Sequence, residues 1–256
     1  MQHERRENIK KMLDSEGVVN AQELAGRFGV STETIRRDLE ILEKDGLIRR
    51  VHGGAVSLRR HINESAYQSR IMEHTPEKRA IAAKVAELID DGDTVLISPG
   101  TTTLEVATFL TSKKNLTVIT NSLPIAIQLT ENPDINVCCL GGRVRGEDYA
   151  ATGILSLENL ELYNADKLIL GVGCVSPEKG VTDYRMEEAL ILRRFTEAAP
   201  CIIGVADSSK FGQEAGFRIC PVEKLDCLVT DEGADAKTRK IYRKLGVELI
   251  TVKVQE

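Results

Sequence analysis

The chain has 256 residues and a net charge of −5, and 42% of its residues are hydrophobic. This length suits one small and one medium domain. It contains no apolar run of about 18 residues, which a membrane helix requires, and residues 1–6 lack the apolar stretch of a signal peptide. We therefore expect a cytoplasmic protein without a membrane partner.

The charge is distributed unevenly along the chain. Residues 1–60 carry 12 Lys and Arg against 10 Asp and Glu, a net charge of +2, whereas residues 61–256 carry 22 against 29, a net charge of −7. A basic N-terminal segment on an acidic body favours nucleic-acid binding by that segment alone.

Three short amphipathic helices are predicted at the N-terminus. The first spans 4–14, with Gly17 as its cap; the second begins after Asn20 and ends at Gly29; the third begins after Ser31 and ends near Gly46. Apolar residues recur at helical spacing in each of them: Ile9, Met12, Leu13, Leu24, Ala25, Phe28, Ile35, Leu39 and Leu42. Two helices joined by so short a link are typical of a helix-turn-helix.

The third helix carries hydroxyl and guanidinium groups opposite its apolar stripe, a combination that suits bases and phosphates in a major groove. Two β-prone runs follow, separated by Gly53-Gly54, and predict a hairpin wing. A single Arg-Arg pair usually lies on a solvated surface without a binding role. Here, however, two such pairs fall on the two elements that are expected to contact DNA. The candidate DNA contacts are Ser31, Thr32, Thr34, Arg36, Arg37, Arg49, Arg50, His52, Gly53 and Gly54.

The rest of the chain predicts a second domain of the α/β class. We expect the winged helix-turn-helix over 1–57, a polar linker over 58–75, and a Rossmann-like domain over 76–256 with a mainly parallel sheet. The buried strands are expected at 94–98, 116–120, 135–140, 167–173, 201–206, 227–230 and 248–252, and helices at 102–111, 123–131, 186–199 and 236–245.

Candidate ligand-binding residues follow several of these strands, where α/β folds collect ligands. Gly100, Thr101, Thr102 and Thr103 open a helix, so their amides and hydroxyls can surround a phosphate, although threonine also commonly caps a helix. Asn121 and Ser122 are candidates for binding sugar hydroxyls, or else they cap the helix that follows. The candidates for binding an anion are Gly141, Gly142, Arg143 and Arg145, which could instead form a surface turn, and Lys210, which could instead lie in a solvated loop. Asp183, Glu187 and Glu188 are weaker candidates for sugar hydroxyls.

Cysteine and histidine give no support for a metal or another cofactor. None of the six cysteines forms a C-x-x-C pair, and all four histidines precede the second domain. We expect buried, reduced thiols, with at least one of Cys138 and Cys139 inside a core strand.

The motifs resemble those of the DeoR/GlpR family of sugar-responsive bacterial regulators. The similar segments are 30–39, Leu42, Gly46, Arg50, 52–55, 100–103, 120–124, 140–142 with Arg145, and 206–212. The resemblance implies an operator-binding domain, a sensor domain similar in fold to ribose-5-phosphate isomerase that binds an effector without turnover, and a homo-oligomer, dimer or tetramer. Two departures bear on effector choice: Ser98 stands where the family often has Asp, and Leu192-Arg193 where it often has Lys-Arg.

We therefore expect a DNA-binding repressor of a carbohydrate-utilisation operon that a phosphorylated sugar releases from double-stranded operator DNA. One alternative is a sugar-phosphate isomerase-like enzyme, which needs a carboxylate base where Ser98 and Cys174 stand. The other is a redox-responsive regulator that uses Cys138 and Cys139.

Overall fold

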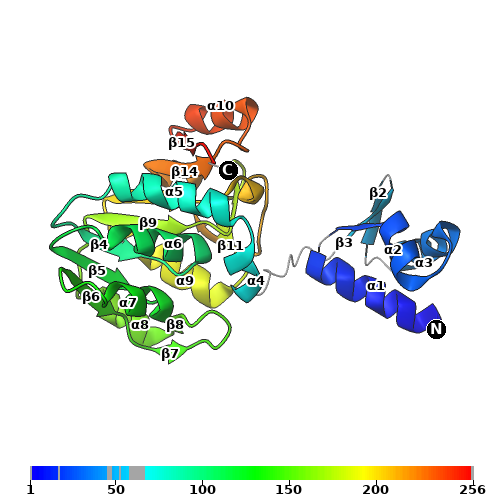
Figure 1. Ribbon diagram of the computed structural model, residues 1–256, viewed down its shortest axis with the longest axis horizontal. Helices are drawn as coiled ribbons and strands as arrows, with labels where there is room; N and C mark the ends of the chain where they lie inside the picture. The colour runs from blue at the N-terminus through cyan, green and yellow to red at the C-terminus, as the bar shows by residue number, and fades with distance from the viewer. Residues whose placement is uncertain (1, 17, 45–47, 52, 58–66, 255–256) are drawn as a thin grey trace. The chain divides into compact units, whose positions relative to one another are not determined.

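The computed structural model describes residues 2–16, 18–44, 48–51, 53–57 and 67–254. The chain divides into two compact units, residues 1–65 and residues 66–256. Figure 1 shows the helices and strands of each unit.

The N-terminal unit is a winged helix-turn-helix. Its helices are α1 (Gln2–Glu16), α2 (Ala21–Phe28) and α3 (Thr32–Lys44), and its strands are β1 (Val18–Asn20), β2 (Ile48–Val51) and β3 (Gly54–Ser57). The strands form an antiparallel sheet in the order β1-β3-β2. The predicted apolar stripes meet in one core that includes Ile9, Leu13, Leu24, Ile35, Leu39 and Leu42.

The local signals at the helix ends act as predicted. The Asn20 side chain accepts a hydrogen bond from the backbone N–H of Gln22 at 2.8 Å, and Gly29 ends α2 in the left-handed conformation with φ of 62°. The hydroxyl of Ser31 accepts from the backbone N–H of Thr34 at 3.2 Å. The predicted stops at Gly17 and Gly46 lie outside the described residues.

The wing differs from its prediction in the position of the turn. Val51 pairs with Gly54, so Gly54 belongs to β3 rather than to the turn. Gly54 also pairs with Asn20 of β1, a strand that the sequence analysis missed. A Cβ added at Gly54 would lie 1.9 Å from the carbonyl oxygen of Val19, so glycine is required because another backbone approaches it.

The C-terminal unit contains a seven-stranded sheet in which all the described strand pairs are parallel, as predicted. The strand order is β15-β14-β12-β9-β4-β5-β6. The strands are β4 (Thr94–Ile97), β5 (Leu116–Thr120), β6 (Ile135–Cys139), β9 (Lys167–Gly171), β12 (Cys201–Val205), β14 (Cys227–Asp231) and β15 (Glu248–Val252).

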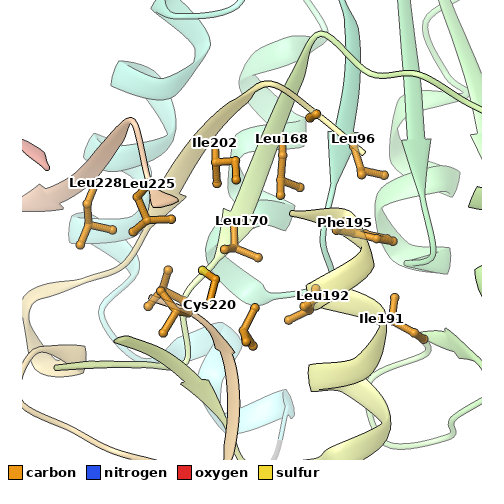
Figure 2. Close-up of a cluster of buried hydrophobic side chains, with 14 of the residues drawn as sticks. Leu96, Leu168, Leu170, Ile191, Leu192, Phe195, Ile202, Cys220, Leu225 and Leu228 are labelled. Carbon is orange, nitrogen blue, oxygen red and sulfur yellow. The ribbon is translucent and has the colours of Figure 1, made fainter. Parts of the chain in front are cut away.

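Helices cover both faces of this sheet. One core layer includes Ile81, Val106 and Leu129, from α5 (Thr75–Glu87), α6 (Thr101–Leu110) and α7 (Leu123–Leu129). The other includes Leu160, Phe195 and Tyr242, from α8 (Ile154–Leu160), α9 (Met186–Phe195) and α10 (Ala236–Lys244), and Figure 2 shows part of it. Two buried faces explain why the strands are apolar runs without alternation.

Several short elements were not predicted. They are a three-stranded antiparallel sheet of β10 (Cys174–Ser176), β11 (Gly180–Asp183) and β13 (Phe217–Cys220), the hairpin of β7 (Arg143–Val144) and β8 (Ala151–Thr152), helix α8, and two 3-10 turns, Ser208–Lys210 and Val222–Lys224. Within the described part of the chain, no helix is long and apolar enough to cross a membrane.

The segment expected to be a linker, 58–75, contains a helix. Residues 67–72 form α4 (Tyr67–Met72), whose Tyr67 is buried with 7% exposure. The Tyr67 ring meets the ring of Tyr149 edge to face, with centroids 6.5 Å apart. A buried aromatic ring therefore helps to hold a segment that has no apolar period and so gave no helical signal.

Candidate DNA interface and effector site

The exposed face of α3 carries the candidate base contacts. Arg36 and Arg37 have side-chain exposures of 67% and 75%, and each lies near Glu33, at 3.9 and 3.7 Å. These contacts are long and exposed, so both guanidinium groups are free to exchange Glu33 for a phosphate or a guanine. The Ser31 and Thr34 hydroxyls lie 2.9 Å apart at the start of the same helix.

Arg50 of the wing has partners inside the protein. Its Nε donates to Glu43 at 2.8 Å and its Nη1 to Glu40 at 2.9 Å, so it joins β2 to α3. Hydrogen bonds from Arg50 hold the pKa of the Glu43 carboxyl below its usual value. Arg50 therefore braces the wing in addition to any phosphate contact. The Arg49 side chain and His52 lie outside the described residues.

A buried ion pair inside the N-terminal unit was missed by the sequence analysis. Asp38, on α3, is 5% exposed and accepts a hydrogen bond from Nε of Arg5 at 2.6 Å. The bond ties α1 to the helix that carries Arg36 and Arg37. An acidic residue within an apolar helical stripe was the available signal, because such a group is buried only when it is paired.

The candidate phosphate loop lies where the strand order of the large sheet reverses. After β4 the chain adds β5 and β6 on one side and β9 on the other, so β4 and β9 flank the switch point, which is the usual ligand crevice of such sheets. Gly100 opens α6 there and has no capping side chain. A Cβ at Gly171 of β9 would lie 3.2 Å from the Pro99 carbonyl oxygen, so the two strand ends meet closely.

The three threonines of this loop differ in their surroundings. Thr103 is fully buried, and its hydroxyl donates to the Gly100 carbonyl at 3.0 Å, so this hydroxyl is already used within the protein. Thr101 is 7% exposed, whereas Thr102 is half-buried. The first amides of α6 lack acceptors within the helix and lie at its positive end.

Asn121 and Ser122 are buried at the end of β5. The Asn121 side-chain amide donates to the Ala151 carbonyl at 2.9 Å, so this residue holds β8 in place. Its Oδ1 atom is buried and has no partner among the described residues. Ser122 is 2% exposed and pairs with Ala150 through a single β-bridge.

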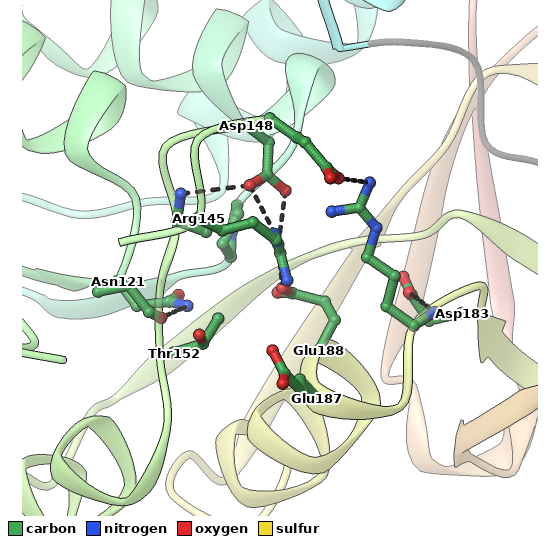
Figure 3. A network of polar contacts seen from close by, with 12 residues as sticks. Asn121, Arg145, Asp148, Thr152, Asp183, Glu187 and Glu188 are labelled. Carbon is green, nitrogen blue, oxygen red and sulfur yellow. Dashed lines mark hydrogen bonds and ion pairs between the residues drawn. The ribbon is translucent and has the colours of Figure 1, made fainter. Parts of the chain in front are cut away.

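Arg145 is the centre of a buried ionic cluster (Figure 3). Its guanidinium donates to both oxygens of Asp148, at 2.8 and 2.5 Å, and its Nη2 lies 2.6 Å from Oε2 of Glu188. Two carboxylates therefore already surround the group expected to bind an anion. Burial lowers and these carboxylates raise the pKa of Arg145, with a net upward shift, so it stays charged.

Glu188 and Arg145 each retain an unused polar atom. In the part of the chain that the structure describes, Oε1 of Glu188 and Nη1 of Arg145 are buried without a hydrogen-bond partner. Burial raises the pKa of Glu188 to about 7, even though Arg145 opposes that shift. Unsatisfied buried polar atoms are costly, and they mark places where a bound molecule can supply the missing partners.

The other predicted residues of this edge have different roles. Gly142 is required, because a Cβ there would lie 2.5 Å from the Thr152 carbonyl oxygen. The Gly141 N–H donates to the side chain of Asn159 at 3.0 Å. Arg143 is exposed and pairs with exposed Glu187 at 3.1 Å, so of the two arginines only Arg145 points into the protein.

Lys210 and a lysine that was not predicted share an electrostatic environment. The Lys210 ammonium lies 4.0 Å from the buried Asp207. Lys78 of α5 is 3% exposed and donates to the carbonyls of Arg70 and Glu73; burial lowers its pKa, while Asp207 raises it. Lys78 lies three residues before Ile81, a fully buried residue of the same helix, and this helical spacing was the missed signal.

The two departures from the family pattern have structural partners. The hydroxyl of Ser98 accepts from the Gly171 N–H at 2.8 Å and so joins β4 to β9. Leu192 is 2% exposed in the core beneath α9, so it packs against protein and is not placed to contact an effector. The Sγ atom of Cys174 lies 2.9 Å from the Tyr184 hydroxyl.

The expectation about the cysteine pair was wrong. Cys138 is half-buried and Cys139 exposed, because β6 is the edge strand of the sheet. Partial desolvation nevertheless raises the pKa of the Cys139 thiol, which disfavours the reactive thiolate. The buried cysteines are Cys174, Cys220 and Cys227.

Comparison with known proteins decides the family. Residues 5–61 match the DeoR-like helix-turn-helix domain, and residues 73–232 match the DeoR C terminal sensor domain. The chain belongs to the DeoR family. The two matched ranges begin in α1 and just after α4, so α4 lies in the interval between them.

Relatives that match nearly the full length of this chain are named as regulators. The chain is 35% identical to a putative aga operon transcriptional repressor of Escherichia coli O157:H7, over 97% of this chain and 93% of the relative. It is 33% identical to the glycerol-3-phosphate regulon repressor of Escherichia coli K12, over 90% and 91%. The helix-turn-helix of this family implies that the chain binds DNA.

Among solved structures, the chain is similar to ribose 5-phosphate isomerase A from Neisseria gonorrhoeae, with 20% identity, 54% coverage of each chain and a TM-score of 0.41. This similarity concerns the fold alone. The named regulators among the relatives favour a role other than catalysis.

Proposed function

We propose that this DeoR-family chain represses a carbohydrate-utilisation operon and that a phosphorylated sugar releases it from its operator. The observation that carries the proposal is the meeting of an uncapped helix N-terminus at Gly100 with the switch point of the sheet. Backbone amides at the positive end of α6 bind a phosphate without a basic side chain. Thr102, the half-buried threonine, supplies a hydroxyl beside them.

The proposal assigns the sugar hydroxyls to the cluster around Arg145 rather than the phosphate. Asp148 and Glu188 already surround this guanidinium, so a second anion gains little there. The unpartnered Nη1 of Arg145, Oε1 of Glu188 and Oδ1 of Asn121 offer one donor and two polar oxygens. Neutral hydroxyl groups can satisfy both kinds of atom, because a hydroxyl donates and accepts.

On the DNA side, α3 is proposed to enter the major groove, with Arg36 and Arg37 at the bases or phosphates and the wing beside it. The N-terminal unit is small, so we propose a cytoplasmic homo-oligomer whose paired helix-turn-helix units engage repeated half-sites. Effector binding then favours an arrangement that no longer matches the operator. Reciprocity requires operator DNA to weaken effector binding by the same factor.

A thermal-shift screen tests the effector assignment. All five tyrosines lie between residues 67 and 242 and the chain has no tryptophan, so tyrosine fluorescence reports on the C-terminal unit alone. A phosphorylated sugar should raise the melting temperature of this unit, whereas its unphosphorylated form should not. Equal stabilisation by both forms, or by neither, contradicts the phosphate assignment.

The isomerase alternative has one observation in its favour, the Glu188 carboxyl with a pKa of about 7. Arg145 holds one of its oxygens, however, and Ser98 and Cys174 are bound to other protein groups. Incubation of the same samples with ribose 5-phosphate should therefore show no isomerisation. The redox alternative is disfavoured by the raised pKa of the Cys139 thiol.

A further inference from the structure

Helix α4 lies against two parts of the candidate effector site, although the sequence predicted a linker there. It packs against α6, the helix that begins at Gly100. Its Tyr67 ring meets the ring of Tyr149, a neighbour of Asp148 in the loop that follows Arg145. Its C-terminal end is hydrogen-bonded to Lys78, whose ammonium lies in the electrostatic field of Asp207 and Lys210.

The contact through Tyr67 combines a buried aromatic ring with a charged group above that ring. Tyr67 is 7% exposed, and the guanidinium of Arg70 lies 5.6 Å from the centre of its ring. Burial raises the pKa of the Tyr67 hydroxyl, and Asp148 adds to that increase. The first residue of α4 therefore lies within electrostatic range of the carboxylate that binds Arg145.

The contact through Lys78 fixes the opposite end of the helix. The Lys78 ammonium donates to the carbonyls of Arg70 and Glu73, and the Thr75 hydroxyl donates to the carbonyls of Ile71 and Met72 at 3.2 and 3.1 Å. These are the carbonyls that a helix leaves without partners at its C-terminus. Asp207 and Lys210 both act electrostatically on the Lys78 ammonium.

The chain is also sharply bent directly after α4. His74 lies in the left-handed region with φ of 52°, which is uncommon for a residue other than glycine. It separates α4 from α5, so the two helices are distinct elements that side-chain contacts hold together. In sequence, α4 is the described element that joins the C-terminal unit to the segment leading from the DNA-binding unit.

We propose that α4 is the coupling element of this regulator, held by Tyr67 and Lys78, through which occupation of the effector site changes the affinity of the N-terminal unit for operator DNA. Lys78 and Tyr67 are positioning residues in this mechanism, because they act on α4 and not on DNA. This proposal depends on the proposed function for the chemical class of the effector. The response of α4 to operator DNA does not depend on it.

The test uses the full chain and the variant Lys78→Met, with Lys84→Met as its control. Lys84 lies on the same helix but is exposed and pairs with Glu87. The probes are a duplex from the region upstream of its own gene, and fructose 6-phosphate, glucosamine 6-phosphate, ribose 5-phosphate and glycerol 3-phosphate. Lys78→Met should bind the operator alone, and each phosphorylated compound alone, with an affinity within about threefold of that of the unsubstituted protein. In Lys84→Met the effector should lower operator affinity by about tenfold or more, and in Lys78→Met most of this effect should be lost.

A second measurement requires no substitution. Hydrogen exchange of residues 67–73 should change on addition of operator duplex, and change again on addition of the sugar phosphate. If tyrosine fluorescence shows that Lys78→Met is unfolded, Thr75→Val removes two of the four carbonyl contacts more mildly and should weaken the response in the same direction.

The outcomes separate this proposal from the proposed function. A full wild-type response in folded Lys78→Met, or unchanged exchange of 67–73 with every probe, overturns the coupling role of α4. If none of the three sugar phosphates binds, and neither does glycerol 3-phosphate, the proposed effector class fails, and the exchange of 67–73 with and without operator duplex still decides the role of α4.

Discussion

Arg145 and Glu188 form a buried pair in which Nη2 of the guanidinium lies 2.6 Å from Oε2 of the carboxylate, while Nη1 and Oε1 lack partners among the described residues. The pair joins the loop after β7 to α9. Its incomplete hydrogen bonding and the pKa of Glu188 near 7 are the features that distinguish it from an ordinary structural ion pair.

The pKa of Glu188 makes stability depend on pH. The folded value of about 7 lies above the ordinary 4.5, so between these values the folded protein holds a proton that the unfolded chain has released. This contribution is complete below pH 4.5 and is lost as pH rises through 7, by up to about 3 kcal/mol. The free energy of unfolding can be measured at pH 5 and pH 8 by urea titration followed by tyrosine fluorescence. Its change between the two pH values should be smaller in Glu188→Gln than in the unsubstituted protein, and an equal change would disprove the assignment to Glu188.

The two arginines of the β7 region should differ in their contribution to stability. Arg145→Met leaves the buried carboxylates of Asp148 and Glu188 unpaired and should lower the free energy of unfolding by about 3–5 kcal/mol. Arg143→Met removes only an exposed pair and should cost less than about 1 kcal/mol. Urea titration of both variants compares them, and similar losses would show that Arg145 is not part of a buried network.

Operator binding should depend more on α3 than on the braced arginine of the wing. Arg36→Ala or Arg37→Ala should each weaken operator binding by about 1–3 kcal/mol if the residue contacts a base. Arg50→Ala should have a smaller effect, because Glu40 and Glu43 already hold its guanidinium. Fluorescence anisotropy at fixed ionic strength measures these losses, and a larger loss for Arg50 would place the main contact on the wing.

Substitution in the α6 loop should separate effector binding from DNA binding. Thr102→Ala should leave operator affinity unchanged and weaken the response to a sugar phosphate, because one hydroxyl beside the proposed phosphate is lost. Thr108→Ala, an exposed position of the same helix, is the matched control. Operator titrations with and without the effector provide the readout; a loss of DNA binding in Thr102→Ala would mean that the two units have been given the wrong roles.

Gly54→Ala should damage the N-terminal unit selectively, because its Cβ would overlap the Val19 carbonyl. We expect a loss of more than about 2 kcal/mol, whereas Gly26→Ala, which has open space around it within a helix, should be neutral or stabilising. Operator binding reports on this unit, and far-UV circular dichroism should show a partial loss of helix while tyrosine fluorescence, which reports on the C-terminal unit, remains unchanged. Normal operator binding by Gly54→Ala would contradict the three-stranded arrangement.

Much of the fold could be predicted because its signals are local. The seven parallel strands are apolar runs, since both faces of the sheet are buried, and Asn20, Gly29 and Ser31 act at helix ends through neighbouring amides. The two-residue strands β7 and β8 and the three-residue β1 are too short for a periodic pattern, and β1 also depends on β3, a partner far along the chain.

The site was predicted less completely, because the partners of its residues are distant in sequence. Arg145 was expected to meet an anionic ligand, but Glu188 lies 43 residues further along and occupies that position. Lys78 was absent from the candidates because its role depends on Asp207 and on carbonyls of α4. Residue types at strand ends thus pointed to one edge of the sheet as a candidate site, but they could not show how the charges there are paired.

The most direct test of the account is the affinity of the full chain for its operator, measured by anisotropy with and without each phosphorylated sugar. One of these sugars should weaken operator binding by about tenfold or more, and its unphosphorylated form should have no effect. Operator affinity that stays constant with every phosphorylated sugar, although the C-terminal unit is stabilised by one of them, would contradict the account.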